Sequence, residues 1–266
     1  MGTVDAVSVA TAIWAARRSG QLLDPRALLG DIDMDEAYRV QRALTDLRVA
    51  AGERIVGWKL GYTSNAMREQ MGVAEPNFGP LTDAMILGSG DAVASELVQP
   101  RVEPEIAFRF GTALSAVNGT VRRRDVLDAV DMAVSCLEVV HSSWLGYRFT
   151  IAQNTADGSS AAQVVLGRAL DAEDLAAVEV ELTVDGSPAG HGRGADASGH
   201  PADGVVWLLG QLAVRGLGLH AGDVVITGGL TRAAPLAPGG TATARYTGGG
   251  LAAAVTIGVR RSVPAA

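Results

Sequence analysis

The chain has 266 residues, of which 48% are hydrophobic and 19% charged, and its net charge is −7 at pH 7. This composition excludes intrinsic disorder, and the acidic balance argues against a nucleic-acid partner. The single cysteine excludes an internal disulfide, and the absence of a run of about 18 apolar residues argues against a membrane span. The apolar stretch Val4–Ala16 is followed rather than preceded by arginines, the wrong order for a signal peptide, so we expect a cytoplasmic protein.

The first 50 or so residues are predicted to be helical. Apolar residues recur at near-helical spacing before Gly20, which can end a first helix. Asp33 can cap a second helix, with Glu36 three residues further on in a capping-box-like pair. We therefore expect a helical N-terminal lobe over residues 1–52 and a β-rich body over residues 53–266, although the two could equally count as one domain.

From Arg54 onward, short β-type runs are separated by turns rich in glycine, proline and aspartate. The expected strands are Arg54–Tyr62, Glu105–Phe110, Val134–His141, Ala162–Leu166, Val178–Val184, Asp223–Thr227, Thr241–Tyr246 and Ala252–Val259. Two expected helices, Arg122–Ala133 and Pro201–Arg215, interrupt them. Because strands outnumber helices without alternating regularly with them, the pattern favours an α+β fold around a mixed, largely antiparallel sheet over a parallel doubly wound sheet.

Lysine is nearly absent from this sequence. Of the 22 basic residues only one, Lys59, is a lysine, which makes it a candidate for a task that arginine cannot perform. In an extended segment Lys59 shares one face with Gly57 and Gly61, and small neighbours would leave space around its amine. Such an amine suits anion binding, proton transfer or a Schiff base. The alternative is chance survival on a surface strand.

Three glutamates form the strongest constellation. Glu103 and Glu105 flank Pro104 and project to the same face of an extended segment, where they repel each other unless a cation or proton lies between them. Glu138 lies within the apolar run Cys136–Val140, where an unpartnered carboxylate would be costly. An all-oxygen site of this kind favours Mg²⁺ or Mn²⁺. The alternatives are two exposed acids on an edge strand and a buried ion pair between Glu138 and an arginine.

Other polar segments carry weaker signals. The loops 154–161 and 227–231 resemble substrate-holding turns, but also ordinary ones. The histidines show no metal-ligand spacing, and His141, although it follows Glu138 closely, is expected to be structural. Cys136 is expected to belong to the core rather than to act as a nucleophile. Motifs for serine hydrolases, nucleotide-binding P-loops, HExxH metal sites and Rossmann cofactor sites are missing from the sequence.

Taken in order, these motifs resemble the 2-keto-4-pentenoate hydratase / 4-oxalocrotonate decarboxylase family, within the fumarylacetoacetate hydrolase superfamily. The resemblance covers roughly residues 5–260, and the Glu-Pro-Glu motif combined with a later glutamate and an upstream lysine is its most specific part. The matching runs are Gly57–Ser64, Glu75–Met85, Pro100–Phe108, Cys136–Val140, Thr155–Asp157, Ser160, Val165–Gly167 and Ala221–Thr231.

The resemblance implies a fold and a site. The fold would be a β-roll or incomplete barrel with flanking helices and a helical N-terminal region. Glu103, Glu105 and Glu138 match the family's ligands for Mg²⁺ or Mn²⁺, Lys59 matches its active-site lysine, and Ser160 a substrate contact. Members usually form homo-oligomers, and hydratases and decarboxylases of this kind can associate with a pathway-partner enzyme.

Two departures from the family pattern affect the expected substrate. Asn77 stands where many relatives carry an acid, and Asp157–Ala161 reads differently from the usual Ala-Asp-Asn-Ala-Ser-Ser segment. We expect Asn77 and Thr231 to contact the substrate. The proton donors and acceptors beyond Lys59 are left open, with Asp157 and Asp83 as candidates, of which we count Asp157 among the catalytic residues.

The resemblance implies a metal-dependent hydratase that adds water to a 2-hydroxy-2,4-dienoate to give a 4-hydroxy-2-oxo acid. The alternative within the same class is a 4-oxalocrotonate-type decarboxylase. Two further alternatives are a relative recruited to another 2-oxo acid and a mainly structural partner subunit.

Overall fold

The computed structural model describes residues 4–64, 68–69, 73–93, 97–116, 119–172, 174–247 and 253–259. None of the helices in these ranges combines the length and apolar character that crossing a membrane requires. The α-helices are α1 (Ala6–Ser19), α2 (Pro25–Leu29), α3 (Met34–Ala50), α5 (Arg123–Ala129), α6 (Ile151–Ala156) and α7 (Pro201–Val214). Short 3-10 turns cover Asp83–Met85, Leu145–Tyr147, Leu175–Ala177 and Gly194–Asp196.

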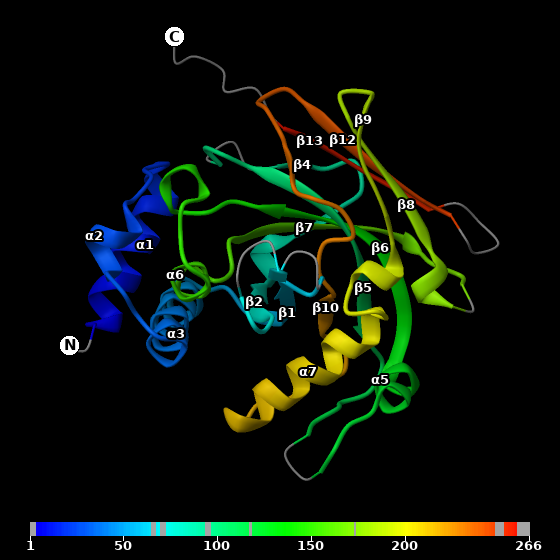
Figure 1. Ribbon diagram of the computed structural model, residues 1–266, viewed down its shortest axis with the longest axis horizontal. Helices are drawn as coiled ribbons and strands as arrows, with labels where there is room; N and C mark the ends of the chain where they lie inside the picture. The colour runs from blue at the N-terminus through cyan, green and yellow to red at the C-terminus, as the bar shows by residue number, and fades with distance from the viewer. Residues whose placement is uncertain are drawn as a thin grey trace.

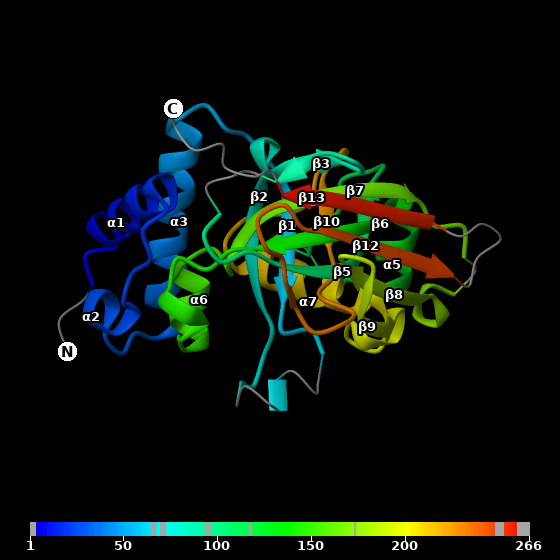
Figure 2. The same ribbon diagram turned by 90° about the horizontal axis from the view of Figure 1, so that it is seen from above.

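Gly20 and Asp33 bound the N-terminal helices as the sequence predicts, whereas the cap at Asp5 was not predicted. Asp5 and Asp33 accept backbone N–H groups at the starts of α1 and α3, and Gly20 ends α1 in the left-handed conformation. The short helix α2, capped by Asp24, was not predicted. Helices α1–α3 and α6 gather at one end of the molecule (Figures 1 and 2). They share a hydrophobic cluster of their own that includes Trp144, and the division at residue 52 stays a prediction.

Two sheets make up the rest of the molecule. The larger has the order β2-β1-β10-β5-β6-β7-β3, with β11 also paired to β5, and the smaller has the order β4-β13-β12-β8-β9. Only three of the recorded pairs, β1–β10, β3–β7 and β4–β13, are parallel. The predicted α+β class with a mixed, largely antiparallel sheet is therefore confirmed.

The strand bounds follow in chain order. They are β1 (Ile55–Gly61), β2 (Asn77–Thr82), β3 (Ile86–Gly88), β4 (Ala92–Val93), β5 (Arg101–Phe110), β6 (Val130–Val140), β7 (Ala161–Ala169), β8 (Glu179–Val184), β9 (Ser187–Arg193), β10 (Val224–Ile226), β11 (Ala234–Pro235), β12 (Thr241–Thr247) and β13 (Ala253–Val259). The main core lies between the two sheets and α7, and its largest fully buried members include Tyr246, Phe108 and Leu208.

Three expectations about elements need correction. The helix expected over 122–133 ends at Ala129, and the chain continues as β6, in which Val130 pairs with Phe110. The 154–161 segment, expected to be a loop, begins in α6. Strands β2 and β9 were not predicted because both contain proline and glycine, which usually indicate turns.

Close backbone approach explains one of the strand glycines. A Cβ at Gly57 would lie 1.8 Å from the carbonyl oxygen of Val224 on the neighbouring β10. We expect Gly57→Ala to lower the free energy of unfolding by at least about 1–3 kcal/mol, because β1 and β10 must separate. Gly210, exposed within α7 with no atom near its added Cβ, is the matched control. Gly210→Ala should stabilise by roughly 0.5–1 kcal/mol. Urea unfolding measures both, and equal stability of the two variants would contradict the close approach.

Candidate metal and active site

The three glutamates come together at the centre of the larger sheet. Glu103 and Glu105 lie on β5, and Glu138 lies on the adjacent β6, directly opposite Glu103 in the antiparallel register. One carboxylate oxygen from each lies within 4.8 Å of the others. The alternation of side chains along β5 and the register of one strand pair are sufficient to produce this cluster.

The cluster is buried and strongly charged. Glu105 and Glu138 are fully buried, and Glu103 is half-buried. Burial raises the pKa of all three carboxyl groups, and repulsion from Glu138 adds to the effect at Glu103 and Glu105. Glu105 Oε2 accepts a 2.7 Å hydrogen bond from the N–H of Gly228. Among the described residues, however, Glu105 Oε1 and Glu138 Oε1 have no hydrogen-bond partner. Buried carboxylate oxygens without partners, facing one another, fit a hard divalent cation.

Lys59 lies beside the glutamates, on β1. Its side chain is 4% exposed, and its Nζ lies 3.1 Å from Glu138 Oε2. The same Nζ donates a 3.1 Å hydrogen bond to the carbonyl oxygen of Ser159. Burial alone would lower the pKa of Lys59, but the Glu138, Glu105 and Glu103 carboxylates together raise it. The alternative of chance survival on the surface is therefore excluded for this lysine.

The glycines flanking Lys59 have a different role from the one expected. They do not leave open space, because a Cβ at Gly61 would lie 2.3 Å from Asn77 Oδ1 and one at Gly57 would strike β10. Both positions need glycine for close packing against neighbouring segments. The space around the lysine comes instead from a cavity in front of the sheet.

That cavity has a volume of about 420 Å³ and contains part of the predicted site. Lys59, Glu103 and Ser160 line it. Asn154 and Ser159, from the segment 154–161 with the weaker signal, also line it. The sequence did not single out the remaining polar residues of its wall, Tyr62, Arg101, Tyr147 and Arg232. Arg101 could have been found, because it lies two residues before Glu103 and alternation places both on one strand face. The others come from loops and from a 3-10 turn, which no strand periodicity locates.

Asn77 lies behind the cavity wall as part of a hydrogen-bonded chain. Its Nδ2 donates to Asn154 Oδ1 at 3.2 Å and to Thr155 Oγ1 at 2.9 Å, and its Oδ1 accepts from Ser159 Oγ at 2.9 Å. Asn154 Nδ2 then donates to Ser160 Oγ at 2.8 Å. An amide satisfies this arrangement because it donates and accepts at once, whereas an ionised acid only accepts.

The remaining predicted residues lie outside the cavity wall. Asp157 is fully buried, and its carboxylate forms a 2.6 Å ion pair with Arg17. Thr231 packs where Gly190 of β9 leaves room, and its hydroxyl donates to the carbonyl oxygen of Arg232. Asp83 forms an ion pair with Arg54 near the surface. The structure thus brings Lys59, Ser160 and the glutamates together. The side chains of Asp157, Thr231 and Asp83 lie elsewhere.

His141 and Cys136 lie close to the site in the chain. Both are buried, and burial lowers the pKa of His141 to about 4 and raises that of Cys136. Cys136 Sγ donates to the carbonyl oxygen of Glu105. The thiol is therefore held in its unreactive form within the core.

Titration of Glu103 is expected to make the metal-free protein less stable as the pH rises from about 5 to about 7. Burial and the Glu138 carboxylate raise the pKa of Glu103 to about 7, against about 4.3 in an unfolded chain. Between these values the folded state binds more protons than the unfolded state, so the free energy of unfolding falls with rising pH. Urea unfolding in EDTA at about pH 5.5 and about pH 7.5 would measure the fall. His141 acts in the opposite direction, because its lowered pKa adds stability as the pH rises above about 4. The contribution of Glu103 is therefore the difference between the parent and Glu103→Gln, and equal pH dependence in the two proteins would contradict the assignment.

Comparison with known proteins agrees with this geometry. Residues 54–256 match the fumarylacetoacetate (FAA) hydrolase C-terminal family. The chain is 36% identical to a 2-hydroxyhexa-2,4-dienoate hydratase from Comamonas testosteroni over 85% of this chain and 88% of that protein. It is also 36% identical to a 2-keto-4-pentenoate hydratase from Paraburkholderia xenovorans (strain LB400), over 86% and 87% of the two chains.

A solved structure of the same family has a similar fold. The chain superimposes on 4-oxalocrotonate decarboxylase from Pseudomonas putida G7, complexed with magnesium and adipate, with a TM-score of 0.89. The sequences are 31% identical, and the match covers 97% of this chain and 98% of the other. The resemblance predicted from the sequence motifs is confirmed, and the chain belongs to the hydratase and decarboxylase family within the fumarylacetoacetate hydrolase superfamily.

Proposed function

We propose that this protein is a divalent-metal-dependent lyase that adds water to a 2-hydroxy-2,4-dienoate and forms a 4-hydroxy-2-oxo acid. The observation that carries the proposal is the cluster of Glu103, Glu105 and Glu138 beside the buried Lys59, at the base of a cavity. Relatives named as hydratases of such dienoates, at 36% identity over most of the chain, support it.

The three glutamates would hold the metal, for which we propose Mg²⁺ or Mn²⁺. When bound, such an ion supplies Lewis acidity toward the oxygens of a 2-oxo acid. The unpartnered oxygens of Glu105 and Glu138 support this assignment, because none of the described groups donates a hydrogen bond to them and the single ammonium of Lys59 offsets only one of the three negative charges. Magnesium in the similar decarboxylase structure is consistent with it.

Lys59 is the proposed catalytic residue. Its 3.1 Å ion pair with Glu138 favours the protonated form of the amine. A protonated amine donates hydrogen bonds and is not a nucleophile, which favours anion stabilisation over a Schiff base. Addition of water at C4 of the unsaturated 2-oxo acid develops negative charge at the C2 oxygen, and we assign Lys59 to stabilise that charge and hold a proton there.

Ser160 is the proposed substrate contact. Its Oγ accepts a hydrogen bond from Asn154 Nδ2, which leaves the hydroxyl proton for an acceptor in the cavity. Asn77 supports the same wall through Ser159 and Asn154. An amide is neither an acid nor a base near neutral pH, so we place no proton relay at Asn77.

A 4-oxalocrotonate-type decarboxylase is the second candidate, and one observation favours it. Arg101 and Arg232 line the same cavity as Lys59 and Glu103. Guanidinium groups suit a second carboxylate, which a dicarboxylic 2-oxo acid carries and a simple pentadienoate does not. Both reactions need the same three glutamates and the lysine. The side chains that line the cavity, rather than the glutamate cluster, therefore determine which substrate is accepted.

A two-channel assay tests the proposal. Fresh 2-hydroxypenta-2,4-dienoate with Mg²⁺ or Mn²⁺ is followed by loss of its ultraviolet absorbance, and 2-oxo-3-hexenedioate is followed by CO₂ release. Turnover in the first channel that EDTA abolishes supports the hydratase, and turnover in the second alone supports the decarboxylase. Silence in both channels from protein that binds metal contradicts both and directs the search to other 2-oxo acids.

The resemblance also leads us to propose a homo-oligomer in the cytoplasm. Light scattering on the purified protein would measure the number of subunits. A mainly structural subunit that associates with a pathway enzyme is the competing proposal. Titration of Mn²⁺ into the metal-free protein distinguishes a structural subunit from the proposed lyase, because a structural subunit needs no metal at the glutamates.

A further inference from the structure

The turn that faces Lys59 has an unusual backbone. Gly158, Ser159 and Ser160 follow one another with φ values of 74°, 56° and 57°, all in the left-handed region. Two of these residues are serines, which rarely adopt that conformation. Such conformations persist only where the surrounding structure imposes them. The question is therefore what imposes this one.

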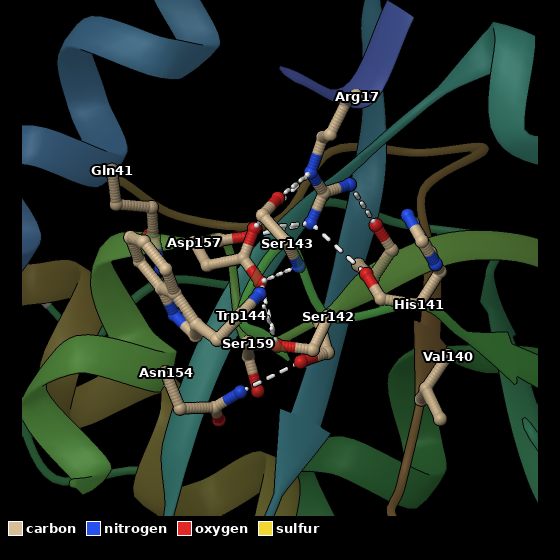
Figure 3. A network of polar contacts seen from close by, with 12 residues as sticks. Arg17, Gln41, Val140, His141, Ser142, Ser143, Trp144, Asn154, Asp157 and Ser159 are labelled. Atoms are coloured by element: carbon tan, nitrogen blue, oxygen red, sulfur yellow. Dashed lines mark hydrogen bonds and ion pairs between the residues drawn. The ribbon is translucent and has the colours of Figure 1, made fainter. Parts of the chain in front are cut away.

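A single guanidinium group contacts both ends of the turn. Arg17, near the end of α1, donates through Nη2 to the carbonyl oxygen of Asp157 at 2.7 Å and through Nη1 to that of Ala161 at 2.7 Å. These two residues immediately flank the three left-handed ones. Figure 3 shows Arg17 reaching across from its helix to the Asp157 segment.

The Asp157 carboxylate completes the contact. Its Oδ1 accepts from Arg17 Nη2 at 2.6 Å and from Ser143 Oγ at 2.8 Å, and its Oδ2 accepts from the N–H of Ser143 at 2.9 Å. Asp157 is fully buried and Arg17 is 9% exposed, so little solvent screens the ion pair. Figure 3 shows these groups on one side of the turn, with Ser159 and Asn154 nearby.

The turn sets the position of the proposed catalytic amine. Ser159 supplies two of the partners of Lys59 Nζ, its carbonyl oxygen at 3.1 Å and its hydroxyl at 3.4 Å, and Glu138 Oε2 is the third. The carbonyl oxygen of Ser160 accepts a 2.8 Å hydrogen bond from the N–H of His141, just beyond β6. A change in the turn would therefore alter the hydrogen bonds of Lys59 and those at the end of the strand that carries Glu138.

We propose that Arg17 is a positioning residue that holds the 158–160 turn, and through Ser159 the amine of Lys59, in the geometry that the reaction requires. Only the expected effect of Arg17 on turnover rests on the proposed function. Its expected effect on the position of Lys59 does not. Lysine cannot replace Arg17, because a point ammonium cannot reach the Asp157 and Ala161 carbonyls and the Asp157 carboxylate together as the planar fork does.

The presence of one lysine in the chain gives a direct test. Protein labelled with lysine that carries ¹³C only at Cε shows one side-chain signal, that of Lys59. In folded Arg17→Ala and Arg17→Lys protein we expect that signal to shift or broaden, and amide hydrogen exchange across residues 157–161 to quicken at least about tenfold. Arg18→Ala, which alters the exposed neighbour on the same helix, should change neither.

Turnover provides the second readout. Misplacement of a catalytic group by about 1 Å can cost about 100-fold, so kcat of the Arg17 variants should fall by about 10- to 100-fold with a smaller change in KM. Guanidinium ion added to Arg17→Ala should restore part of kcat. If Arg17→Ala does not fold because Asp157 is left unpaired, Arg17→Met combined with Asp157→Asn removes both charges and keeps the test.

The outcomes separate this proposal from the proposed function. A moved lysine signal and faster exchange in the variants support the positioning role even where the parent is silent in both assay channels, a result that would overturn only the function. An unchanged lysine signal and unchanged exchange in a folded Arg17 variant overturn the positioning role, whatever the parent turns over.

Discussion

Glu138→Gln is expected to abolish metal-dependent turnover while leaving the fold in place. The amide has nearly the same shape as the carboxylate but no charge, so the cluster would lose one of its three anionic ligands. Because loss of outer partners alone costs metal sites about 10- to 100-fold in affinity, loss of a ligand should lower the affinity for Mn²⁺ by at least about 100-fold. Glu105→Gln should behave in the same way.

Isothermal titration of Mn²⁺ into metal-free protein measures this loss, and circular dichroism checks the fold. Glu181→Gln is the matched control, because Glu181 is an exposed strand glutamate on β8, in the other sheet. It should bind Mn²⁺ as the parent does. A Glu138→Gln protein that binds Mn²⁺ with the parent's affinity would show that the three-glutamate site is wrong.

Lys59→Met should separate turnover from metal binding. Methionine fills the space of the lysine stem but supplies no proton and no positive charge. A positioned proton donor typically contributes about 100- to 10,000-fold, so kcat should fall within that range. Mn²⁺ affinity should stay the same or rise, because Nζ no longer competes for Glu138 Oε2, which lies 3.1 Å away.

Steady-state kinetics and Mn²⁺ titration on the same protein preparation decide this prediction. Lys59→Arg is an informative companion, since it keeps the charge but places a bulkier group in a space that Ser159 and Glu138 already limit. It should rescue little. Full activity in Lys59→Met, or loss of Mn²⁺ binding along with activity, would count against the assigned role.

The sequence was sufficient to predict the glutamate cluster, and the reason is local. Strand alternation relates Glu103 to Glu105, and the cost of burying a lone carboxylate singles out Glu138. Both arguments need only a few neighbouring residues. The same holds for the helix start at Asp33, where the side chain accepts one of the first free N–H groups.

What the sequence could not supply depends on distant contacts. Asp157 was expected to take part in proton transfer because it lies in a polar segment, but its partner, Arg17, is 140 residues away. Nothing in the spacing of either residue indicates the other. Strands β2 and β9 were missed for a similar reason, since a Cβ at Gly79 or Gly192 would strike a backbone carbonyl from a remote loop.

The placement of β10 in the larger sheet determines when the two halves of the site can meet. Strands β5, β6 and β7 are consecutive neighbours in both chain and sheet, so the glutamates can be brought together early. The lysine-bearing strand β1 pairs with β10, and β10 in turn pairs with β5. A growing chain therefore carries all four ionisable groups long before residues 224–226 are made, yet lacks the strand that joins them. The strand that links the lysine to the carboxylates within the sheet is thus made after the rest of the cluster.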